Sequence, residues 1–276
     1  MRRILLGLLT VGSVVGITVY ATNAFFSDVE TSNDNIFTAG NIDLGIDNHS
    51  YYNGVPNPGT TWRVDYDISD DPARQFFNFT DVKPGDWGED TISLHVKDND
   101  SWLCADVKLT SDDENDLVDP EADDGDVTEG DGNGELADRI NFYWWADDGD
   151  NVFEGDETLL PSGTLGTLAV DQTATVALAD SATNIWTSLT GDPLTPDNVR
   201  FVAKAWCFGN TTMTPYLQDG GNRQSGPDDR PVVCDGSQEN NVTQSDSLTA
   251  DVSFRAVQSR NNLSFLCNPP APTPTP

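Results

Sequence analysis

The amino-acid sequence predicts an all-β fold, a β-sandwich of short strands joined by acidic loops. Apolar and polar residues alternate over several short runs, which is typical of strands with one buried face. Clusters of Gly, Pro, Asn and Asp separate these runs. Beyond the N-terminal apolar run, no stretch has the spacing of an amphipathic helix, so we expect strands to form the core.

The predicted strands follow one another along the chain. The first spans 37–46, where Ile42, Leu44 and Ile46 keep a period of two. The same alternation predicts further strands at 61–69, 91–97, 102–110, 139–146, 173–178, 198–208 and 247–257. In 139–146 both faces are apolar, which predicts a central strand covered on both sides.

Residues 112–138 break this alternation and are dense in Asp, Glu and Gly. We expect a solvated acidic insertion loop on the surface, in which 134–138 begins a short helical turn. A Pro-rich tail, 269–276, is expected to be extended. These boundaries leave one β-sandwich domain at 25–268.

The first 24 residues have the pattern of a secretory signal peptide. Arg2 and Arg3 precede an apolar run from Ile4 to Val19, and small residues precede a cut after Ala24. The run is short for a membrane span, which needs about 20 apolar residues. We therefore expect cleavage between Ala24 and Phe25, no stable membrane span afterwards, and a secreted mature protein.

The net charge of −32 disfavours nucleic acid as a partner, because phosphate binding requires clustered Lys and Arg. Such a charge attracts cations and repels further copies of the chain. A saline habitat is an alternative explanation of the acidic composition.

Four cysteines follow the predicted export signal, and an even number in an oxidising compartment predicts two disulfides. Three pairings are possible. We favour Cys207–Cys234, which closes the shorter loop, together with Cys104–Cys267. No CxxC spacing indicates a zinc or redox site.

The residues after the cut resemble the start of mature TasA/camelysin-family proteins. Phe25-Phe26-Ser27-Asp28 is followed at 35–44 by Asn-Ile-Phe-Thr-Ala-Gly-Asn-Ile-Asp-Leu, the pattern shared by that family. Blocks at 134–137, 143–151, 205–209, 234–236 and 257–267 are similar to those of its larger, cysteine-containing members. The resemblance implies a jelly-roll-like β-sandwich, processing by a SipW-type signal peptidase, and a place in the extracellular biofilm matrix or on the cell surface.

We expect such a protein to assemble into fibres by N-terminal strand donation. The predicted donor strand comprises Phe25, Phe26, Ser27, Asp28, Val29 and Glu30. Added to a sheet edge of the next copy, it would build a head-to-tail homopolymer. The alternative is a non-polymerising, calcium-stabilised surface or adhesion module.

One acidic stretch suggests a cation site. Closely spaced carboxylates around a glycine turn supply the oxygen ligands that Ca²⁺ prefers, and we expect them at Asp147, Asp150, Glu154 and Glu157. Their spacing is not that of an EF-hand. An acidic hairpin that binds no ion is the open alternative.

The sequence does not predict an enzyme. Its two histidines belong to no HExxH motif, and it has no Gly-x-Ser-x-Gly elbow and no P-loop. A camelysin-type protease is the third alternative, which the missing metal motif disfavours.

Overall fold

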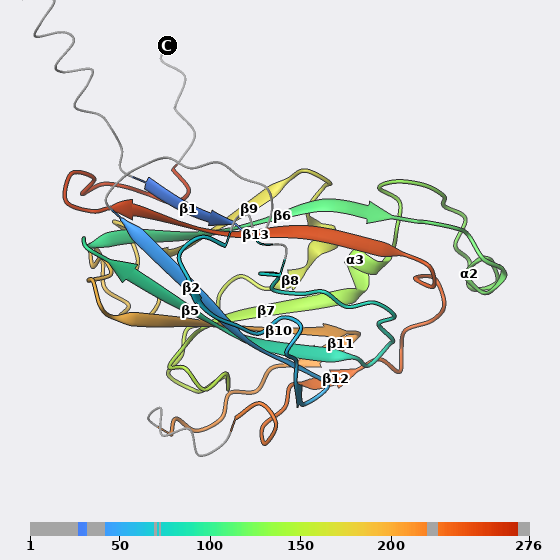
Figure 1. Ribbon diagram of the computed structural model, residues 1–276. Coiled ribbons are helices and arrows are strands. Elements are labelled where there is room, and N and C mark those ends of the chain that lie inside the picture. The colour runs from blue at the N-terminus through green and yellow to red at the C-terminus, as the bar shows by residue number, and fades with distance from the viewer. Residues whose placement is uncertain (1–26, 32–41, 69–70, 72, 220–225, 270–276) are drawn as a thin grey trace, which may run out of the picture.

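Two antiparallel sheets pack face to face and form the body of the molecule (Figure 1). The computed structural model describes residues 27–31, 42–68, 71, 73–219 and 226–269. The predicted signal peptide with its cut between Ala24 and Phe25, the donor residue Phe26 and tail residues 270–276 lie outside the described residues. The predicted all-β sandwich is confirmed.

The smaller sheet has four strands in the order β1-β13-β6-β9, so that β1 and β9 form its edges. All of its pairings are antiparallel. Its strands are β1 (Ser27–Thr31), β6 (Ser101–Asp113), β9 (Thr173–Ala179) and β13 (Ser247–Gln258).

The larger sheet has the order β3-β2-β5-β10-β7-β8, and β4 also pairs with β2. Its strands are β2 (Asp43–Tyr52), β3 (Val55–Pro56), β4 (Trp62–Asp65), β5 (Trp87–Lys97), β7 (Ile140–Asp147), β8 (Gly163–Thr164) and β10 (Val199–Phe208). A small hairpin joins β11 (Asn210–Thr212) to β12 (Val233–Asp235). The described helices are short: α2 (Asp119–Asp124), α3 (Leu136–Arg139) and the 3₁₀ turn η1 (Leu165–Thr167).

The core lies between the sheets and follows the predicted alternation. Ile42, Leu44 and Ile46 are at most 3% exposed. They belong to one apolar cluster with residues of β5, β6 and β13, including Ile92, Leu94, Leu103 and Phe254. Burial of alternate side chains on both inner faces is what fixes the register of such strands.

Strand β7 is covered on both faces, as predicted, but it is not central in its sheet. Its outer-face residue Trp145 is 1% exposed and packs against Phe153. It pairs with β10 on one side and with the two-residue strand β8 on the other. Residues 158–160 continue the pairing, since the Ala146 N–H donates to the Thr158 carbonyl at 2.9 Å.

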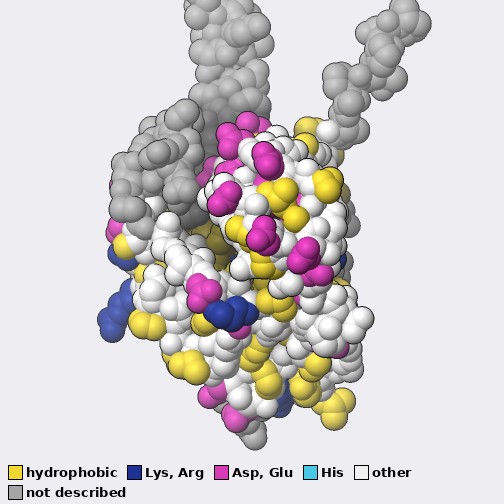
Figure 2. Space-filling view, turned by 90° about the vertical axis from the view of Figure 1, so that its right-hand side faces the viewer, with side chains coloured by type: hydrophobic (Ala, Val, Ile, Leu, Met, Phe, Trp, Pro, Cys, Tyr) yellow, Lys and Arg dark blue, Asp and Glu magenta, His cyan; other side chains and the backbone are white. Residues whose placement is uncertain are grey.

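The acidic insertion 112–138 is not solvated throughout, contrary to expectation. It contains α2, and its last residues begin α3, where a short helical turn was predicted. Glu121 on α2 is fully buried, and Asp126 is 6% exposed. On the face that carries α2, many other acidic side chains gather at the surface (Figure 2).

Both disulfides have the favoured pairing. Cys104–Cys267 ties β6 to the segment that follows β13, and Cys207–Cys234 ties β10 to β12. Two disulfides indicate a protein that folds in an oxidising environment outside the cytoplasm.

Within the described part of the chain, no helix is both long and apolar enough to cross a membrane.

Candidate functional site

The predicted donor strand lies at the edge of the smaller sheet. Residues 27–30 belong to β1, which pairs antiparallel with β13 from Ser27 opposite Val257 to Thr31 opposite Ser253. In this structure β1 therefore pairs within its own chain (Figure 1). Donation to a second copy stays a prediction.

The position of β1 gives it two properties. It is an edge strand, and among the described residues β13 is the one strand with which it pairs. It is also the first described element of the chain, and its departure would leave the β13–β6 ladder in place. Without β1, the edge of β13 would present unpaired N–H and C=O groups, which readily pair with a strand of another chain.

The last residue of β7 and the loop that follows it contain all four predicted cation ligands, but two of these, Asp147 and Glu157, brace the loop itself. Asp147 accepts hydrogen bonds from Trp145 Nε1 at 3.0 Å and from the Gly149 and Asn151 N–H groups at 2.9 and 3.1 Å. Glu157 accepts from the Asp148 and Glu154 N–H groups at 3.0 and 2.8 Å. Burial raises the pKa of Asp147 to about 7 and that of Glu157 to about 9.

The other two predicted ligands lie beside a third acid. Oxygens of Asp148, Asp150 and Glu154 come within 4.8 Å of one another, so this group could hold a metal ion. Glu154 is fully buried, and burial raises the pKa of both Asp150 and Glu154. The group already has a cation of the chain beside it, because Arg230 Nη1 lies 3.5 Å from Glu154 Oε1.

Arg230 reaches this loop because a separate segment is folded against it. The Tyr216 N–H donates to the Phe153 carbonyl at 2.9 Å, and the Gly155 N–H donates to the Tyr216 carbonyl at 3.0 Å. The Cys207–Cys234 disulfide closes the segment that carries Tyr216 and Arg230. Sequence reasoning missed Asp148 and Arg230, since the arginine is remote in sequence.

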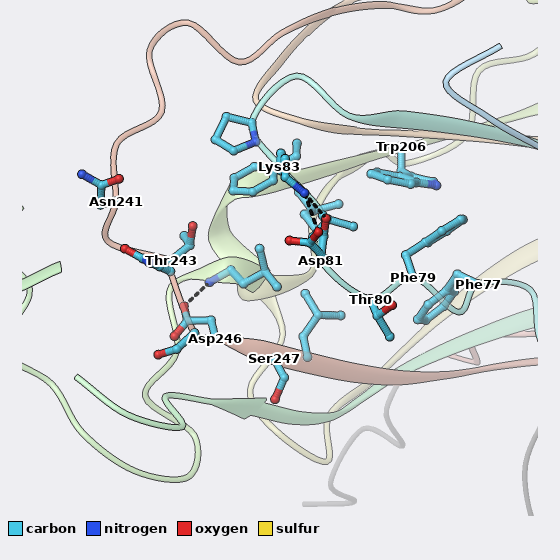
Figure 3. Close-up of a pocket in the computed structure, with 18 of the residues that line it drawn as sticks. Phe77, Phe79, Thr80, Asp81, Lys83, Trp206, Asn241, Thr243, Asp246 and Ser247 are labelled. Atoms are coloured by element: carbon cyan, nitrogen blue, oxygen red, sulfur yellow. Dashed lines mark hydrogen bonds and ion pairs between the residues drawn. The ribbon is translucent and has the colours of Figure 1, made fainter. Parts of the chain in front are cut away.

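A pocket of about 770 Å³ opens beside the start of β13 (Figure 3). Its floor is aromatic, with Phe77, Phe79 and Trp206; Phe79 stacks on Tyr52 and lies tilted against Trp206. Its rim is polar and includes Asp81, Lys83, Thr243, Asp246 and Ser247. Such a lining suits a largely apolar ligand with a polar end. Sequence reasoning did not predict this pocket, because segments far apart in the chain build its wall.

The described residues also contain two acidic groups that share Glu114, at the end of β6: Glu114, Asp126 and Glu135, and Glu114, Glu121 and Asp246. Sequence reasoning missed them as well. One sequence signal was present. Glu114 follows one run of alternating apolar residues, and Asp246 precedes another. These runs form β6 and β13, whose pairing brings the two acids together.

These features define a class, a disulfide-bonded all-β sandwich with buried acidic groups that could hold metal ions. No protein-family model matches the chain, and no curated protein matches it. Membership of the TasA/camelysin family therefore stays a prediction from the sequence motifs.

Proposed function

We propose that this chain is a secreted structural protein of the extracellular matrix or cell surface, of the TasA/camelysin type. It assembles into fibres by donating its N-terminal strand. The observation that carries the proposal is the place of β1, an edge strand at the start of the described chain, paired along β13. The sequence motifs around it support the same conclusion.

In the proposed assembly, a SipW-type peptidase cuts between Ala24 and Phe25. The freed strand leaves β13 of its own chain and pairs with β13 of the next copy. Because the same backbone hydrogen bonds form in both arrangements, the exchange costs little free energy once the strand is released. The contact is head-to-tail and does not close, so it grows a filament. Cations and salt would screen the charge of −32 that opposes packing of copies.

Cysteine cross-linking tests this register directly. Residues 29 and 255 are opposite each other across β1 and β13, a separation that a disulfide can span. We expect a mixture of the single variants Val29→Cys and Arg255→Cys to form disulfide-linked dimers under conditions in which electron microscopy shows filaments. A mixture of Val29→Cys with Leu248→Cys, near the other end of β13, is the matched control.

Deletion of residues 25–31 should abolish the filaments. Monomers from the intact mature chain under every condition, with no cross-link in the first mixture, would overturn the proposal.

The acidic groups favour a second candidate, a non-polymerising calcium-stabilised surface or adhesion module. It would stay monomeric at all concentrations and gain thermal stability from Ca²⁺. Sedimentation with and without Ca²⁺ separates the two candidates.

A further inference from the structure

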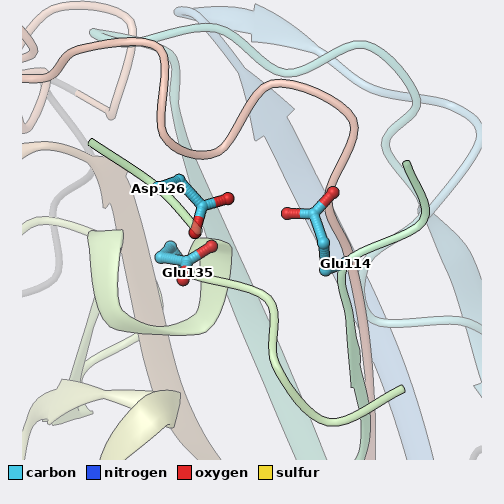
Figure 4. A group of neighbouring side chains, drawn as sticks. All are labelled: Glu114, Asp126 and Glu135. Carbon is cyan, nitrogen blue, oxygen red and sulfur yellow. The ribbon is translucent and has the colours of Figure 1, made fainter. Parts of the chain in front are cut away.

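Five acidic side chains meet where β6 ends and β13 begins, and we refer to them as the carboxylate nest: Glu114, Glu121, Asp126, Glu135 and Asp246. Pairing of Asp113 with Ser247 brings Glu114 next to Asp246. The acidic insertion then folds back and adds the other three. Figure 4 shows Glu114, Asp126 and Glu135 pointing toward one another.

Each nest carboxylate is held in place through one of its oxygens. Glu114 Oε1 accepts the Asp116 N–H at 3.2 Å, and Glu121 Oε2 accepts the Val118 N–H at 2.8 Å. Asp246 Oδ2 accepts the N–H groups of residues 135 and 136 at 2.6 and 2.9 Å.

Thr128 holds the remaining two carboxylates. It donates its N–H and its hydroxyl to Asp126 Oδ1, at 2.9 and 2.7 Å. The same hydroxyl lies 3.1 Å from Glu135 Oε1, and its one hydrogen serves one of these acceptors at a time. The donors that orient the nest are thus neutral.

The second oxygen of every nest carboxylate is buried and receives no hydrogen bond within the described structure: Glu114 Oε2, Glu121 Oε1, Asp126 Oδ2, Glu135 Oε2 and Asp246 Oδ1. Three of the residues are more than nine-tenths buried, since Glu114 is 3%, Glu121 0% and Asp126 6% exposed. Within each of the two groups, ligand oxygens lie within 4.8 Å of one another. Buried polar atoms are normally satisfied, so these five oxygens without a donor indicate a missing partner.

The missing partner carries positive charge. None of the ion pairs between described residues involves a nest carboxylate. Carboxylates at these separations repel one another, and a cation from solution would relieve that repulsion.

We propose that the carboxylate nest is a calcium site, with Glu114 shared between its two ligand groups. Ca²⁺ takes six to eight oxygen ligands in flexible geometry, whereas Mg²⁺ keeps most of its waters and Zn²⁺ prefers nitrogen and sulfur. The bound ion fastens the acidic insertion to the ends of β6 and β13. The inference does not depend on fibre assembly.

Titration calorimetry on the full mature chain, stripped with EDTA, tests the proposal. Calcium alone is the probe. We expect Glu114→Gln and Asp246→Asn each to weaken binding by about 100-fold, since even outer-shell changes cost 10–100-fold. Glu129→Gln is the matched control, because it removes one exposed charge from the same insertion. Glu154→Gln, in the loop after β7, should also leave nest binding intact.

A structural measurement covers the case in which a nest variant fails to fold. Crystals of the unmodified chain grown with Ca²⁺ should show an ion between Glu114 and Asp246. Native affinity in both nest variants, or calcium confined to the group of Asp148, Asp150 and Glu154, would overturn the proposal.

Discussion

The loop after β7 and the carboxylate nest both bury acidic side chains, but they balance the charge in different ways. In the loop, backbone N–H groups use both oxygens of Glu157, and Arg230 faces Glu154. In the nest, the second oxygen of each acid has no donor, as is also true of Asp150 Oδ2 and Glu154 Oε2 in the loop, but no ion pair between described residues reaches a nest acid. Buried negative charge requires a counter-charge, which the chain supplies at the loop and leaves to the solution at the nest.

The size of the repulsion supports this reading. Two unit charges 4.8 Å apart, the limit within each nest group, repel by about 3.5 kcal/mol at an effective dielectric constant of 20. A domain is stable by about 5–15 kcal/mol in total. Several such pairs could not all stay ionised without a cation, so protonation or an ion must intervene.

The largest expected effect concerns the disulfide that clamps the segment bearing Arg230. Changing Cys207 and Cys234 to Ser should lower the free energy of unfolding by about 3–4 kcal/mol, because the bridge closes a loop with a separation of 27 residues. Urea denaturation measures the loss. Calcium affinity at the nest should stay unchanged in this variant. A parallel loss of that affinity would show that the two acidic regions are not independent.

Calcium itself should have the next largest effect. At a concentration 100 times its dissociation constant, a ligand of the folded state adds about 2.7 kcal/mol to the free energy of unfolding. We expect this gain in the unmodified chain by calorimetry, and its loss in Glu114→Gln. Equal gains in the free energy of unfolding of both chains would show that the ion binds outside the nest.

Arg230→Gln should make the loop resemble the nest. Loss of the guanidinium leaves the fully buried Glu154 without its cation, which we expect to cost about 2 kcal/mol. Added Ca²⁺ should restore part of that stability and occupy a new site at Asp150 and Glu154. Arg260→Gln, at an exposed arginine, is the control. A variant as stable as the unmodified chain would refute the balancing role of Arg230.

A further effect is expected from pH. The pKa values of Asp147, Asp246 and Glu157 are raised to about 7, 8 and 9 from ordinary values near 4. The folded chain thus holds these protons more tightly than the unfolded chain. Their stabilisation is complete below about pH 4 and is lost as pH rises to about 9.

In EDTA, stability should therefore fall from pH 5 to 9, by about 1.4 kcal/mol per pH unit for each group that differs in protonation between the folded and unfolded chains. Calcium should make the slope shallower, because the bound ion keeps Asp246 ionised. Thermal denaturation at several pH values measures both slopes, and stability that is flat or rising in EDTA would contradict the shifts.

Much of the fold could be predicted from the sequence, because alternation reports burial directly. Ile42, Leu44 and Ile46 face the core as predicted, and both disulfides have the favoured pairing. The buried part of the insertion could not be predicted, since an acid-rich segment usually stays in water. Glu121 becomes buried through the way the insertion folds back over β6, which local composition does not encode.

The candidate sites were predicted less completely. Local spacing correctly marked Asp150 and Glu154 as neighbours, but it could not reveal that backbone groups occupy Asp147 and Glu157. The nest assembles acids from two chain segments that meet at one end of a long-range strand pairing. Such a site follows from topology and not from a motif.

Hydrogen exchange of the unmodified chain, with and without Ca²⁺, tests the contrast between the two acidic regions most directly. We expect calcium to slow exchange of the amides at 114–136, next to the nest, and to leave those at 147–157 unchanged. Protection of the amides at 147–157 with none at 114–136 would contradict the account. Calcium would then bind at the loop, although Arg230 already lies beside its buried Glu154.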